Sequence, residues 1–164
     1  MKRKLVVIGV VLMVLFIGTG GCDESDKAGC SNSKDNYVNV IVEARVHVTV
    51  SDNFYEAPWT DALLDVEIDK SGGERVSEQK TTDSQGDTSF IRGTFKVYRE
   101  QSVSVCATVI GGPMPEFMGV ESWDPEKFYL LNNCETLSWG VISETDWGGT
   151  HYWYPTVDLR IFPQ

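Results

Sequence analysis

Basic residues, histidines and long apolar runs are all scarce in this sequence, and each shortage argues against a class of function. Lys and Arg together number 14 against 24 Asp and Glu. Because a surface this acidic repels phosphate backbones, we expect no nucleic-acid partner. The two histidines, His47 and His151, have no zinc-like His/Cys spacing around them, and no calcium loop or Gly-rich phosphate loop is present. The sequence therefore predicts no metal, no cofactor and no catalytic residue, and a hydrolase ranks behind the binding functions considered below.

The longest apolar run, Leu5 to Ile17, lies near the N-terminus and is short for a stable membrane span. As a helix it would extend about 20 Å at ~1.5 Å per residue, against a hydrocarbon core of about 30 Å. Basic residues 2–4 precede the run, and small residues 18–21 lead from it to Cys22. This order of charge, apolar run and small residues is typical of an export signal.

The end of this segment resembles the lipobox of prokaryotic lipoproteins, in which a cysteine accepts diacylglycerol and the peptidase cuts before it. The resemblance implies removal of residues 1–21, a lipid on Cys22, and a location at the cell membrane that faces the periplasm or the cell exterior. Two alternatives stay open, an uncleaved N-terminal helix as the anchor and a secreted protein. Removal of residues 1–21 leaves 11 basic against 24 acidic residues, a formal charge of −13. Electrostatic attraction to anionic lipid would then not help the anchor.

The mature chain is expected to consist of a disordered acidic spacer at 22–36 and one β-sandwich domain at 37–164. In an exported chain disulfides persist, and Cys106 and Cys134 both lie inside the folded region, so they are the expected pair. Cys30 is then free or pairs between chains. If Cys22 carries no lipid, a second pair, Cys22–Cys30, becomes possible.

Alternation of apolar and polar residues predicts the fold. Valine or alanine occupies every second position from Val38 to Val50, which indicates a β-strand with one buried face. Its length predicts a bend or a change of sheet partway along. Shorter alternating segments lie at 64–68, 88–98, 103–109 and 157–161, with a polar edge strand at 74–82. Residues 124–127 have the Asp-Pro start of a short helix. The pattern predicts an all-β sandwich of about six to eight strands.

Residues 48–109 resemble the immunoglobulin-like sandwich modules related to transthyretin and to the carboxypeptidase regulatory domain. The resemblance rests on the strand and turn at 48–52, the turn and strand at 57–66, and the segment 81–90, which is similar to the Thr-Asp-x-x-Gly turn of those modules. In that turn Asp83 bonds the backbone and Gly86 takes a positive φ. The resemblance implies a non-catalytic spacer, adhesive unit or binding domain.

An aromatic insertion or extension at 111–155 sets this chain apart from a generic sandwich. Aromatic rings interleaved with carboxylates suit sugar stacking or a cationic ligand, and they suit a protein interface equally well. The alternative is that the rings pack over an open face of the sheet. The candidate ligand or partner surface consists of Trp123, Trp139, Trp147, Trp153, Tyr152 and Tyr154. The sequence thus favours a binding or assembly module with a protein partner, ahead of a carbohydrate-binding or other small-ligand protein.

Overall fold

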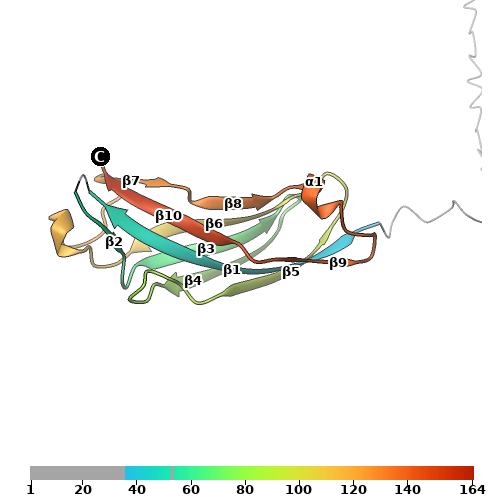
Figure 1. The fold of residues 1–164 in the computed structure, drawn as a ribbon, viewed down its shortest axis with the longest axis horizontal. Helices are drawn as coiled ribbons and strands as arrows, with labels where there is room; N and C mark the ends of the chain where they lie inside the picture. The colour runs from blue at the N-terminus through green and yellow to red at the C-terminus, as the bar shows by residue number, and fades with distance from the viewer. Residues whose placement is uncertain (1–35, 53) are drawn as a thin grey trace, which may run out of the picture. The chain divides into compact units, whose positions relative to one another are not determined.

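The computed structural model describes residues 36–52 and 54–164. The predicted signal segment 1–21, Cys22, Cys30 and all but the last residue of the predicted spacer lie outside these residues. The described part is an all-β sandwich made of a six-stranded and a four-stranded sheet (Figure 1), which confirms the predicted fold class.

The six-stranded sheet contains both the first and the last strand of the sandwich. Its members are β1 (Val38–Ser51), β2 (Glu56–Pro58), β5 (Ile91–Val97), β7 (Phe128–Leu131), β9 (Thr150–Trp153) and β10 (Thr156–Pro163). The second sheet has the order β4 (Glu74–Thr81), β3 (Leu63–Lys70), β6 (Val103–Gly111) and β8 (Cys134–Leu137). Two short helices, η1 (Glu116–Met118) and α1 (Trp139–Ile142), lie in the connections.

Strand β1 organises the larger sheet by changing partners along its length. Its first half pairs with β5 in antiparallel and β9 in parallel orientation. From Arg45 onward it pairs with β10 in parallel, and its last three residues pair with β2. The predicted bend or change of sheet therefore takes the form of a change of neighbours within one sheet. The partners change where β9 gives way to β10, and there the Arg45 N–H donates to the carbonyl of Pro155 at 3.2 Å.

The core lies between the two sheets and follows the predicted parity. All seven alternating residues of β1 from Val38 to Val50 are fully buried. The facing sheet contributes Leu64, Val66 and Ile68 from β3, and β6 contributes Val103, Val105, Ala107 and Val109. Strand β4 is polar and lies at the edge of its sheet, as predicted. Strict period-2 burial on β1, β3 and β6 is what two sheets packed face to face require.

Two details of the connections differ from the sequence prediction. The sandwich has more strands than expected because β2, β7, β8 and β9 contain only three or four residues each. The expected helix start at Asp124 is wrong and forms a turn, in which a carboxylate oxygen of Asp124 accepts the Glu126 N–H at 3.0 Å. The helix does not continue because β7 begins at Phe128, whose side chain is buried.

The disulfide joins Cys106 of β6 to Cys134 of β8, as predicted. The two residues are directly opposite in the antiparallel register. Val105 and Ala107, which flank Cys106 on β6, point into the core, so the disulfide lies on the outer face of the smaller sheet. Outward placement explains why Cys106 breaks the apolar parity of β6.

Candidate functional site

Three of the six predicted surface residues pack against the core. Trp123 lies between Trp59 and Phe128, with ring centroids 5.8 and 5.5 Å away, and Trp59 and Phe128 are buried. Trp139 and Trp153 are half-buried and also contact the core cluster. For these three tryptophans the packing interpretation describes the structure better than an open ligand surface.

The other three predicted residues are exposed, but they do not form one patch of six. Trp147 stacks on Trp139 of α1 at 5.4 Å between centroids, leaving about half of its surface in solvent. Tyr152 and Tyr154 are 59% and 64% exposed, and their rings lie parallel within 7° at 6.4 Å between centroids. Tyr152 sits beside Ile41 in the register of β9 with β1, on the outer face of the larger sheet. Tyr152 of β9 and Tyr154, in the connection to β10, therefore form an exposed stacked pair.

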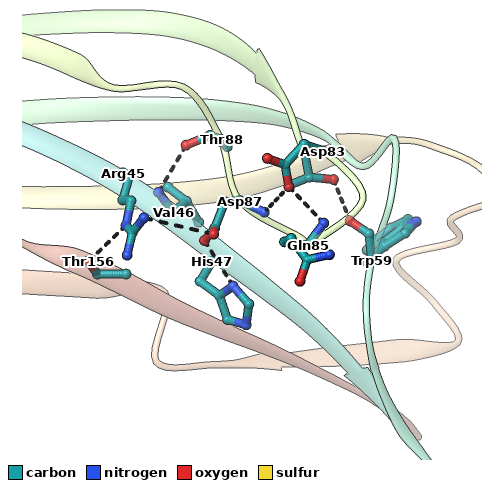
Figure 2. Close-up of polar contacts among 10 residues, drawn as sticks. Arg45, Val46, His47, Trp59, Asp83, Gln85, Asp87, Thr88 and Thr156 are labelled. Atoms are coloured by element: carbon teal, nitrogen blue, oxygen red, sulfur yellow. Dashed lines mark hydrogen bonds and ion pairs between the residues drawn. The ribbon is translucent and has the colours of Figure 1, made fainter.

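The connection between β4 and β5 forms the turn that the family resemblance predicts (Figure 2). One carboxylate oxygen of Asp83 accepts the N–H groups of Gln85 at 2.8 Å and Asp87 at 3.1 Å. Gly86 has a φ of 78°, and its carbonyl accepts the Val48 N–H at 2.8 Å. Both expected roles, those of Asp83 and Gly86, are confirmed. The turn is thereby fixed to β1 in the middle of the larger sheet.

Two threonines at the ends of this turn are buried and use their hydroxyls on neighbouring backbones. The Thr82 hydroxyl accepts the Ala62 N–H at 2.9 Å and donates to the carbonyl of Trp59. The Thr88 hydroxyl accepts the Val46 N–H at 3.0 Å, as Figure 2 shows. These contacts satisfy polar groups that burial would otherwise leave without a partner.

A cluster of ionisable side chains beside the turn was not predicted from the sequence. His47 Nδ1 lies 3.0 Å from a carboxylate oxygen of Asp87, and an Arg45 guanidinium nitrogen lies 3.8 Å from the other oxygen (Figure 2). His47 is half-buried, on the polar parity of β1. Among residues 36–52 and 54–164, no Ser, Thr or Cys side chain hydrogen-bonds to this ring. The contacts that are present fasten the turn to β1.

A second exposed aromatic cluster lies at the β1–β2 connection and was also missed. Phe54 and Tyr55 are 87% and 66% exposed, and the Tyr55 ring contacts Phe117 of η1 at 6.1 Å between centroids. A cavity of about 280 Å³ adjoins this region, and its lining includes Trp59, Asp61 and Met114. The only sign of this cluster in the sequence is the pair Phe54-Tyr55, with Asp52 and Glu56 nearby. Two adjacent aromatic residues after a long predicted strand are too few to indicate a surface.

Within the described residues, neither a metal site nor a membrane-spanning helix is found. No group of three or more His, Cys, Asp or Glu side chains suited to a metal ion occurs within the described ranges. In the same part of the chain, neither helix has the length and apolar character needed to cross a membrane.

The comparisons with known proteins assign no family. No protein-family model matches the chain, and neither the curated proteins nor the solved structures give a significant match.

Proposed function

We propose that this protein is a membrane-tethered extracytoplasmic lipoprotein whose sandwich acts as a non-catalytic binding or assembly module for an envelope or cell-surface partner. The tether is supported by the order of basic residues 2–4, apolar run 5–17, small residues and Cys22. The surface disulfide Cys106–Cys134 suits an oxidising compartment outside the cytoplasm.

The observation that carries the binding role is the exposure of large aromatic side chains on an otherwise acidic domain. Tyr152 and Tyr154 stand in solvent on the larger sheet, while most tryptophans of the same segment pack inward. Tyrosine is favoured at protein interfaces because it combines a large apolar ring with a polar tip at low entropy cost. The pair therefore suits contact with a partner.

A carbohydrate or other small ligand is the second candidate, and the parallel rings of Tyr152 and Tyr154 favour it. Titration of the protein with soluble glycans tests this candidate. Tryptophan fluorescence is the readout, because Trp147 and Trp153 are close in sequence to the tyrosine pair. A saturable change that Tyr152→Ser and Tyr154→Ser both abolish would favour the ligand over a protein partner.

Intact-mass measurement of the membrane-extracted protein, with and without reduction, tests the tether. We expect a chain that begins at Cys22 and carries a lipid increment, with a mass shift on reduction that counts the disulfides. A chain that begins at Met1 would replace the lipid with an uncleaved anchor, and an unmodified chain in the soluble fraction would refute the tether altogether.

Affinity capture through the tyrosine pair tests the binding role. The full-length protein and the Tyr152→Ser/Tyr154→Ser variant are crosslinked in native membranes under the same conditions. Loss of a discrete partner band in the variant supports the proposal, and identical band patterns contradict a role for this face. The matched control is Phe90→Ser, since Phe90 is also exposed, at 51%.

A further inference from the structure

The β1–β2 connection and η1 together bring exposed aromatic rings to one end of the sandwich. We call it the acidic tip and define it as residues 52, 54–61 and 112–126. Its centre is Phe54, Tyr55 and Phe117, and η1 is the gold turn beside the β1–β2 connection in Figure 1. Phe54 is the most exposed of the large hydrophobic side chains of the described chain. Removing an exposed aromatic ring from water is favourable, so a partner that covers Phe54 would gain from the contact.

The fold fixes the backbone that carries these rings. One carboxylate oxygen of Asp52 accepts the N–H groups of Phe54 at 2.7 Å and Tyr55 at 2.6 Å. Behind them, the 112–126 excursion closes on itself through a bridge between Pro113 and Ser122, and Trp123 anchors it to buried Trp59. The rings are therefore presented on a supported turn, which lowers the entropy cost of binding.

The segments that carry these rings have charged residues of one sign. The tip contains seven carboxylates and neither Lys nor Arg, and its acids are Asp52, Glu56, Asp61, Glu116, Glu121, Asp124 and Glu126. The next residue, Lys127, pairs with Asp124 at 3.5 Å. The described ion pairs involve none of the other six acids. Asp52 accepts backbone N–H groups of the turn, and the remaining five acids are exposed.

We propose that the acidic tip docks a basic segment of a partner protein, with an apolar side chain of that segment against Phe54 and Tyr55 and its Lys or Arg residues among the carboxylates. This inference rests on the proposed binding role and names the surface and the chemistry of the partner. Charge complementarity selects the partner, because opposite potentials steer association and suppress wrong partners. Arg also stacks on exposed aromatic faces through a cation–π interaction.

The same charge argues against other occupants. A second copy docked tip to tip would bring two sets of seven carboxylates together, and anionic lipid headgroups would be repelled in the same way. The tip also lies at the end of β1 opposite Val38 (Figure 1), about 45 Å along 14 residues at ~3.3 Å each. The chain enters the sandwich at Val38, so the tip is remote from the point where any N-terminal tether joins the domain.

A photocrosslinking residue, benzoylphenylalanine, tests this inference in the full-length protein in its native membranes. It replaces Phe54 in one variant, Phe90 in a matched exposed control and Tyr152 in a third. We expect the Phe54 probe to form a protein adduct about tenfold more abundant than that of the Phe90 probe, on a partner peptide with net positive charge. Raising the salt concentration screens the exposed carboxylates and should lower this adduct yield for the same Phe54 variant.

Neutralising the tip gives the second measurement. With the probe at Phe54, Glu56→Gln, Glu116→Gln and Glu121→Gln together are expected to lower the adduct yield about tenfold. The matched control neutralises three exposed acids elsewhere, Glu100, Glu135 and Glu144, and leaves the yield unchanged. Circular dichroism confirms that both triple variants fold.

Several outcomes would overturn the inference. Lipid adducts at Phe54 would assign the tip to a membrane surface, and adducts with the same chain would assign it to self-association. A partner peptide without excess Lys or Arg, or a yield insensitive to the three Gln substitutions, would remove the charge argument. Adducts at Tyr152 without any at Phe54 would end this inference and leave the proposed function standing, whereas adducts at neither position would contradict both.

Discussion

Replacing Thr82 by Val should destabilise the sandwich far more than the same change at its neighbour Thr81. Thr82 is buried, and its hydroxyl both accepts the Ala62 N–H and donates to the Trp59 carbonyl. Thr81 is exposed at the end of β4. The two positions differ in burial and bonding, and valine has nearly the shape of threonine.

The magnitude follows from the two groups that lose their partner. A buried N–H or carbonyl left unsatisfied costs about 1–3 kcal/mol, and Ala62 and Trp59 are both fully buried. We therefore expect Thr82→Val to lower the free energy of unfolding by about 2–4 kcal/mol. Thr81→Val should change it by less than about 0.5 kcal/mol, as for an ordinary surface substitution. Thr82→Ser keeps the hydroxyl and should recover much of the loss.

Urea unfolding of the detergent-extracted full-length protein, followed by tryptophan fluorescence, measures these differences. The midpoint should fall for Thr82→Val with little change in the m-value, since the fold and its buried surface stay the same. Equal midpoints for Thr82→Val and Thr81→Val would refute the reasoning. A Thr82→Ser variant as unstable as Thr82→Val would show that the methyl group, and not the hydroxyl, stabilises this turn.

Three further substitutions test the turn, the core and the disulfide. Gly86→Ala should lower the free energy of unfolding by about 2–4 kcal/mol in thermal or urea unfolding, because its new Cβ would lie 2.5 Å from a backbone oxygen of β1. Gly73→Ala is the control: Gly73 has a φ of 96° with open space around it, so this change should cost about 1 kcal/mol. Trp59→Phe should cost about 2 kcal/mol in the same assay, since it removes a hydrogen bond and leaves a void. Cys106→Ala/Cys134→Ala should lower stability by roughly 3–4 kcal/mol for a sequence separation of 28, and an unchanged urea midpoint would contradict the loop-entropy estimate.

The long strands of this fold could be predicted from sequence because period-2 alternation reports one buried face directly. The parity of β1 and β3 follows from it. Strands as short as β2 or β9 contain too few residues for a period to appear. Their existence depends on a long neighbour, β1, that offers free hydrogen-bonding positions.

The candidate site was less predictable because side-chain exposure depends on contacts between distant segments. Tryptophan content alone could not distinguish Trp123, which packs between two buried rings, from Trp147, which is half in solvent. The pairing of His47 with Asp87 joins residues 40 positions apart. The contact of Tyr55 with Phe117 likewise requires that β2 and the 112–126 excursion meet at one end of the sandwich.

The aromatic residues near the acidic tip divide into supporting and presented groups, and this division bears on how a partner would be held. Trp123 packs between the buried rings of Trp59 and Phe128 and so ties the excursion that carries η1 to the core. Phe54 and Tyr55 project beyond that support, fixed by the carboxylate of Asp52. A partner would then meet a turn whose backbone is already ordered, so that less affinity is lost to ordering the loop. The buried tryptophans would thus contribute to binding through the rigidity of the turn, while the exposed rings and the surrounding carboxylates determine which partner fits.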